Sequence, residues 1–113
     1  QDGNTALIHA ARKGHLVTVQ YLVGIGANVE AVEKKYGSTA LRWAAQGGHT
    51  ATVQYLISLG ANVQAVDKSG WTALTLAAYM GHARTVAYLV GQGANLHAVD
   101  KVGLEILLPA VSY

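Results

Sequence analysis

The sequence lacks cysteine altogether, and this absence excludes disulfides, thiolate chemistry and cysteine-type zinc sites together. Charged residues are also few: they make up 12% of the 113 residues, about half the share that is usual in globular domains. No apolar run reaches the roughly 18 residues that a membrane-spanning helix needs. The formal net charge of +2 is too small to indicate nucleic-acid binding by itself.

What the chain has instead is apolar surface. Hydrophobic residues make up 51% of it, which excludes a disordered charged tail. The length fits one domain, which we expect to span residues 1–113. The absence of cysteine and of a signal-peptide pattern favours an intracellular protein, either cytoplasmic or nuclear. Because the chain begins with Gln1 and not with methionine, we expect a fragment or a processed form.

An internal repeat organises the chain. Its copies begin at glycines spaced 34, 33 and 33 residues apart, which are Gly3, Gly37, Gly70 and Gly103. The second and third copies are identical in 19 of 33 columns. This period divides the chain into repeats at residues 3–36, 37–69 and 70–102, followed by a partial copy at 103–113.

Each copy predicts two short helices. The first is expected to start at a threonine whose hydroxyl caps it, namely Thr5, Thr39 or Thr72. It is expected to end at a glycine with a left-handed backbone, namely Gly14, Gly48 or Gly81. The second helix carries apolar residues at helical spacing and ends before "GAN" or its equivalent. Helices this short are marginal alone, so we expect them to be stabilised by stacking on their neighbours.

These residues resemble the ankyrin repeat over essentially the whole chain. The family pattern G-x-T-P-L-H-x-A-A-x-x-G-H, a V-x-x-L-L helix, G-A-D/N-V and a D-x-x-G turn recur in three copies. The family proline is replaced by alanine, and the family histidine by Ile8, Arg42 and Thr75, so the usual Thr–His bond is missing. In the fourth copy Pro109 interrupts the expected first helix. The resemblance implies an all-α solenoid of antiparallel helix pairs joined by β-turn or hairpin fingers.

A search for reactive chemistry in the sequence gives little. His15, His49 and His82 occupy one column of stacked repeats, roughly 8–10 Å apart, whereas one metal ion needs ligands about 2 Å away. The resemblance gives this histidine a structural bond to backbone between repeats. Asp67 and Asp100 are expected to bond to amides of their own turns, and no serine elbow or paired carboxylate is present. We therefore expect no enzyme activity, no metal site and no small-molecule cofactor.

The resemblance places partner binding on the turn tips and on the concave face lined by the first helices. The corresponding positions are Asn4, Arg12, Lys13, Lys34, Lys35, Tyr36, Ser38, Gln46, Gly47, Lys68, Ser69, Trp71, Tyr79, Met80, Lys101, Val102 and Leu104. Among them, Trp71, Tyr79 and Met80 do not recur between copies and are residue types enriched at interfaces, so we expect them to form a contact patch. The alternative is that Trp71 lies over its own turn and Tyr79 along its helix. Trp43, beside an alanine pair, is expected to pack between helices.

The predicted function is protein–protein interaction: a non-catalytic module that binds a protein or peptide. Lysines at the turn tips are expected to steer an acidic partner segment towards the patch, although simple solubility would explain them equally. One alternative is a segment of a longer scaffold, or a unit that self-associates head to tail, because the terminal copies lack a polar outer face. Near-identical repeats with few charges also suit an engineered binder. Binding of nucleic acid or lipid through the lysines is a weaker alternative.

Overall fold

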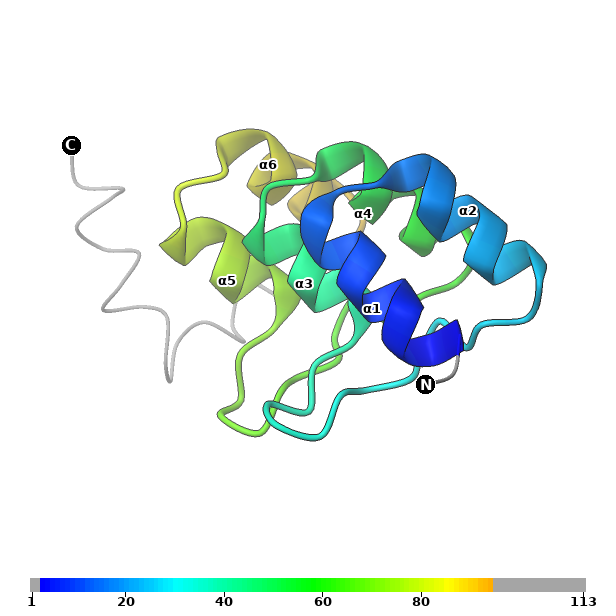
Figure 1. Ribbon diagram of the computed structural model, residues 1–113. Coiled ribbons are helices and arrows are strands. Elements are labelled where there is room, and N and C mark those ends of the chain that lie inside the picture. The colour runs from blue at the N-terminus through cyan, green and yellow to red at the C-terminus, as the bar shows by residue number, and fades with distance from the viewer. Residues whose placement is uncertain (1–2, 95–113) are drawn as a thin grey trace, which may run out of the picture.

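The computed structural model describes residues 3–94, and this part of the chain folds into short helices joined by tight turns (Figure 1). Their bounds are α1 Gly3–Lys13, α2 Leu16–Gly24, α3 Ala40–Gln46, α4 Thr50–Ser58, α5 Ala73–Tyr79 and α6 Ala83–Gly91. The repeat predicted two helices for each copy, and the structure confirms this for all three. The fourth copy lies outside the described residues.

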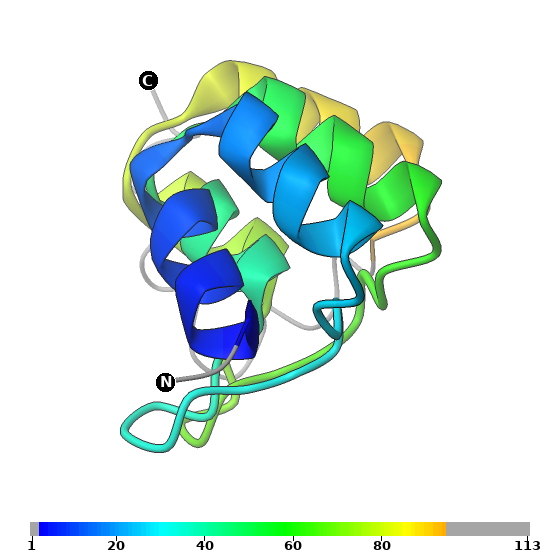
Figure 2. The ribbon, with the colours of Figure 1, turned by 45° about the vertical axis from the view of Figure 1, so that its right-hand side comes forward.

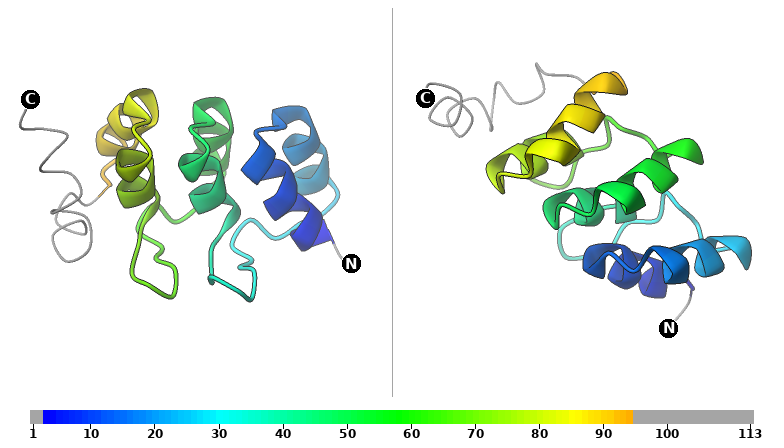
Figure 3. Two further views of the ribbon diagram at one scale, coloured as in Figure 1. Left: turned by 60° about the vertical axis from the view of Figure 1, so that its left-hand side comes forward. Right: turned by 90° about the horizontal axis from the view of Figure 1, so that it is seen from above.

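The helices form two layers. The first helices α1, α3 and α5 stack on one another, and α2, α4 and α6 form the second layer (Figure 2). The connections between repeats project to one side of the helix row (Figure 3, left). We call residues 33–38 finger 1 and residues 67–71 finger 2. Within residues 3–94 there is no strand, and the β-type pairing is limited to an isolated antiparallel bridge between Val32 and Thr39, which flank finger 1.

Threonine caps begin two of the three first helices, as predicted. Thr39 Oγ1 accepts a hydrogen bond from the Arg42 amide at 3.4 Å, and Thr72 Oγ1 accepts one from the Thr75 amide at 3.2 Å. The prediction is wrong for Thr5, because α1 already begins at Gly3 and Thr5 lies inside it. Thr39 and Thr72 have extended backbones and directly follow fingers that are closed by backbone hydrogen bonds. No described finger precedes Thr5.

The "GH" turn joins the second and the third repeat to the repeat before it. Nε2 of His49 lies 3.0 Å from the carbonyl oxygen of Arg12, and Nε2 of His82 lies 2.9 Å from that of Gln46. A carbonyl only accepts, so Nε2 is the protonated nitrogen in both rings. The predicted structural role of this histidine is confirmed for His49 and His82. Gly48 has φ 72° and passes so close to the His82 ring that a Cβ would lie 2.5 Å from Nδ1.

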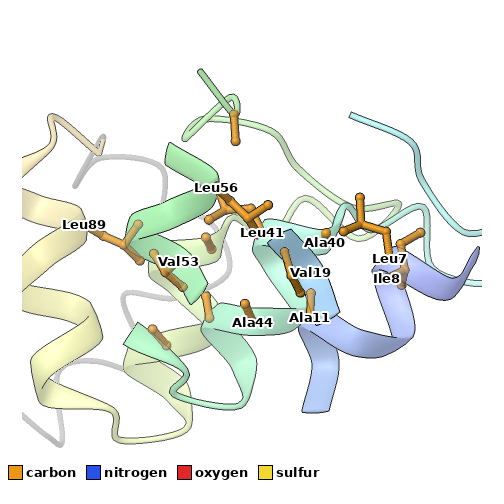
Figure 4. Close-up of a cluster of buried hydrophobic side chains, with 14 of the residues drawn as sticks. Leu7, Ile8, Ala11, Val19, Ala40, Leu41, Ala44, Val53, Leu56 and Leu89 are labelled. Carbon is orange, nitrogen blue, oxygen red and sulfur yellow. The ribbon is translucent and has the colours of Figure 1, made fainter. Parts of the chain in front are cut away.

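The core lies between the two layers and is built from leucine, valine and alanine (Figure 4). Leu7, Leu41 and Leu74 are the equivalent leucines of the first helices, and all three are buried. The alanine pairs beside them leave no side-chain bulk between helices, so the first helices approach closely. Because each repeat covers its neighbour, the first-layer helices present a continuous surface beside the fingers.

Candidate binding groove

A groove runs along the first-layer helices beneath the two fingers. It consists of three depressions of about 440, 770 and 330 Å³ that share lining residues. Arg12 and Trp43 line both the first and the middle depression, whereas Gln46 and Leu76 line both the middle and the third. The depressions therefore form one surface that crosses all three repeats.

Finger 1 is shaped by its own glutamate. Glu33 Oε1 accepts hydrogen bonds from the Tyr36 amide at 2.5 Å and the Ser38 amide at 3.4 Å. The finger is also joined to finger 2, since the Lys68 amide donates to the Tyr36 carbonyl at 2.9 Å and Lys68 Nζ donates to the Lys34 carbonyl. These bonds fix the position of Tyr36 above the groove.

Finger 2 is closed by Asp67, as the sequence predicted. Asp67 Oδ1 accepts from the Ser69 amide at 2.8 Å and from the Trp71 amide at 2.9 Å. Its other oxygen, Oδ2, lies 3.0 Å from Nη2 of Arg42. The aspartate therefore supports the turn and also binds Arg42, which lies on α3 of the same repeat.

Arg42 is buried, although it stands where the family has a histidine. Its side chain is held by Asp67 and by a hydrogen bond from Nη1 to Ser38 Oγ. Burial lowers the pKa of Arg42, and the negative charges of Asp67 and Glu33 oppose that shift, so the guanidinium keeps its charge. In the third repeat, hydroxyls of Thr72 and Thr75 bond to each other at 3.1 Å in place of the missing Thr–His bond.

Trp43 packs against the core, which agrees with the prediction, but it also forms the wall between the first two depressions. The Tyr36 ring meets it nearly edge-on, with centroids 5.9 Å apart. The Arg12 guanidinium lies over its ring, 4.9 Å from the centroid. Its Nε1 is buried and has no hydrogen-bond partner among the described residues. This second role is not predicted from the sequence, in which its only signal is that the column differs in every copy: His9, Trp43 and Leu76.

Trp71, Tyr79 and Met80 line the third depression together. The rings of Trp71 and Tyr79 pack edge to face, with centroids 5.4 Å apart and planes at 87°. Tyr79 is 55% exposed and Met80 47% exposed, whereas Trp71 is partly buried. We call these three residues the aromatic patch.

Comparison with known protein families identifies the repeat. A family model described as ankyrin repeats (3 copies) matches residues 7–100. The chain belongs to the ankyrin repeat family. No curated protein matches it. Ankyrin repeats are generally protein-interaction modules and are typically non-catalytic.

The ankyrin structure brings most of the predicted contact residues to one face. The exposed ones are Arg12, Lys13, Lys34, Lys35, Tyr36, Gly47, Lys68, Ser69, Tyr79 and Met80, and the partly buried ones are Asn4, Gln46 and Trp71. The predicted exposure of Ser38 is wrong: it is 1% exposed, and its hydroxyl accepts a hydrogen bond from the buried Arg42 side chain. Lys101, Val102 and Leu104 lie outside the described residues, as does Asp100.

Charge on this ankyrin face is unevenly compensated. Arg42–Asp67 is the one ion pair found between residues 3 and 94, so Arg12, Lys34 and Lys35 have no carboxylate of the described chain within 4 Å. No group of three or more His, Asp or Glu side chains in the described part could hold a metal ion. The described helices also include none that is long and apolar enough to cross a membrane.

Proposed function

We propose that this ankyrin repeat domain binds a segment of a protein partner along the groove, with the aromatic patch as its main anchor. The observation that carries the proposal is the edge-to-face pair of partly buried Trp71 and exposed Tyr79, which lines a depression together with exposed Met80. Monomers rarely leave such a patch uncovered, and tryptophan and tyrosine are enriched among residues that dominate interface energies.

The pair is also preorganised. The Trp71 amide is tied to Asp67, and each ring restricts the other, so binding a partner orders few additional side-chain torsions. Less conformational entropy is therefore lost than with flexible side chains, which favours affinity. Met80 adds an unbranched thioether that adapts to the partner's surface.

Lysines at the fingers contribute to orientation. Lys34, Lys35 and Lys68 lie at the exposed tips, so their positive field meets an approaching partner before the patch does. This supports a partner segment that carries acidic residues. In this proposal the groove has no catalytic role and binds no metal.

The test is a pull-down that compares the wild-type chain with a Trp71→Ala, Tyr79→Ala double variant and identifies the proteins lost. The matched control is Leu59→Ala, because Leu59 is also an exposed apolar residue (44%) but follows α4 in the second layer. Proteins that the control keeps and the double variant loses support the proposal. An unchanged set of bound proteins would contradict it.

A second candidate rests on the outer face of the first repeat. Thr52 and Thr85 are buried and Tyr55 and Tyr88 pack partly into the core, whereas their equivalents Thr18 and Tyr21 are exposed. His15 is likewise exposed, although its equivalents His49 and His82 bond to a preceding repeat. This face thus has the residues of an interface between repeats, which supports packing against a further ankyrin repeat of the same or another chain.

Self-association through that face is tested by sedimentation across a concentration series. Head-to-tail packing is supported if the apparent molecular mass rises with concentration and if Tyr21→Glu returns it to the monomer value. A strictly monomeric chain removes self-association.

A further inference from the structure

The middle depression contains hydrogen-bond donors that the chain does not use. Trp43 Nε1 and Arg42 Nε are buried without a partner in the described structure. None of the described residues accepts a hydrogen bond from the Arg12 guanidinium, which lies over the Trp43 ring and is exposed. A guanidinium stacked on a ring keeps its N–H donors in its own plane, where they remain available to a ligand.

The acidic residues near these donors are already engaged. Glu33 accepts from two amides of finger 1, and Asp67 accepts from two amides of finger 2 and pairs with Arg42. Arg12, Lys34 and Lys35 therefore leave the depression with positive charge that no described carboxylate offsets within 4 Å. An anionic acceptor is the complementary ligand.

Resting on the function proposed above, we propose that the middle depression is a carboxylate site for an aspartate or glutamate side chain of the partner segment. The carboxylate accepts hydrogen bonds from the Arg12 guanidinium and from Trp43 Nε1–H, in a depression whose exposed rim includes Lys34 and Lys35. Because the exposed Arg12 guanidinium lies over the tryptophan ring, a ligand bound to it lies beside Trp43, and the buried Nε1–H becomes accessible when the indole shifts. Charge-assisted bonds of this kind are shorter and stronger than neutral ones.

This site is confined to the junction of the first two repeats. The equivalents of Arg12 are Gln46 and Tyr79, those of Trp43 are His9 and Leu76, and Tyr36 belongs to the finger with one extra residue. The carboxylate site therefore lies at the α1–α3 end of the groove, and the aromatic patch lies at the α5 end. Since the two depressions share Gln46, Asp67 and Leu76, one extended segment fits both, with an acidic residue at one end and an apolar residue at the other.

The experiment selects binders from a randomised library of displayed 12-residue peptides, using the whole chain. We expect the enriched peptides to share an acidic and an apolar residue at a constant separation. Replacing the acidic residue by its amide, or Arg12→Gln in the chain, should weaken binding about tenfold or more. The two changes together should weaken it little further, because both remove the same interaction.

The matched control is Arg84→Gln, which makes the same substitution and charge change at an exposed position on α6. It should leave the affinity for the selected peptide within about twofold, as expected for an exposed position away from the site. Trp43→Phe keeps an aromatic ring but removes the N–H. It should lower the affinity for the acidic peptide more than the affinity for its amide counterpart. In the wild type, the indole N–H signal of Trp43 should move on binding of the acidic peptide only.

The outcomes separate this site from the proposed function. The carboxylate site is overturned if the selected peptides lose affinity for the Trp71→Ala, Tyr79→Ala variant but not for Arg12→Gln. It is also overturned if they bind equally well when the acidic residue is replaced by its amide. Either result leaves the proposed function standing. The choice of a carboxylate ligand is overturned if the chain binds at least tenfold more tightly to a version of the peptide with phosphoserine in place of the acidic residue. It is also overturned if an oligonucleotide displaces the bound peptide but a second acidic peptide does not. A selection in which no peptide depends on either end of the groove overturns both proposals.

Discussion

Nη2 of Arg42 lies 3.0 Å from Oδ2 of Asp67, and this ion pair joins α3 to finger 2, which leads into the following repeat. Both side chains are largely removed from water, at 5% and 12% exposure. Asp67 Oδ1 meanwhile closes finger 2 beside the aromatic patch. One carboxylate thus links the stability of the stack to the position of the binding surface.

Removing one partner of this pair should destabilise the chain strongly. Asp67→Ala leaves the Arg42 charge buried and uncompensated, so we expect a loss of about 3 kcal/mol in the free energy of unfolding. Arg42→Leu, Asp67→Asn together should recover part of that loss, since no unpaired charge remains and the side-chain amide oxygen can still accept from the finger amides. Urea titration followed by circular dichroism measures both. A loss for Asp67→Ala no larger than that of exposed Arg84→Gln would contradict the role given to the pair.

Two glycine substitutions should change stability in opposite directions. Gly48 has φ 72° and a Cβ there would meet the His82 ring, so Gly48→Ala should destabilise the chain by more than about 1 kcal/mol. Gly24 lies in α2, and a Cβ there would meet nothing within 4 Å, so Gly24→Ala should stabilise by about 0.4–1 kcal/mol. Thermal melts of the two variants check this. Equal shifts of Tm would mean that neither backbone conformation nor contact matters at Gly48.

The histidines of the "GH" turn should differ in how much they stabilise the chain, according to whether they bond to a preceding repeat. His82→Ala removes the bond to the Gln46 carbonyl and leaves that acceptor unpaired, at a cost of about 1–2 kcal/mol. His15 is exposed, so His15→Ala should change the free energy of unfolding by less than about 0.5 kcal/mol. Denaturant titrations of the two variants give the comparison. Similar losses at both positions would show that the histidine acts within its own repeat.

The local features of the fold could be predicted because they depend on neighbouring residues and on the 33-residue period. The caps at Thr39 and Thr72, the left-handed glycines and the Asp67 turn all have this character. The groove depends on contacts that the period does not encode. Ser38 is expected at the surface because the resemblance places its column at the turn tips and groove, but it is buried, and its hydroxyl bonds to Arg42, which stands in the place of the family histidine. Trp43 likewise has no equivalent tryptophan in the other copies, and only the folded position of finger 1 shows that it borders a depression.

Truncating the tryptophan of the aromatic patch tests the proposed anchor. Trp71→Ala should weaken binding of a partner by about 2 kcal/mol or more, as expected for an interface hot spot. The finger bonds to Asp67 use the backbone amide of residue 71, so the helical signal in circular dichroism should remain. Isothermal titration calorimetry with a partner found by pull-down measures the loss, and Leu59→Ala provides the control. Unchanged affinity would remove Trp71 from the binding surface.

Lysines of finger 1 should affect how fast a partner binds more than how long it stays. Lys34 and Lys35 are exposed and have no described carboxylate within 4 Å, so their charge acts mainly on the approaching partner. Lys34→Gln, Lys35→Gln should lower the association rate several-fold while the dissociation rate stays within about twofold. The difference from wild type should shrink at about 1 M salt, where the Debye length falls to about 3 Å. Surface plasmon resonance across salt concentrations measures these rates. A change confined to the dissociation rate would instead place the lysines in the bound interface, because only groups that contact the partner hold it there.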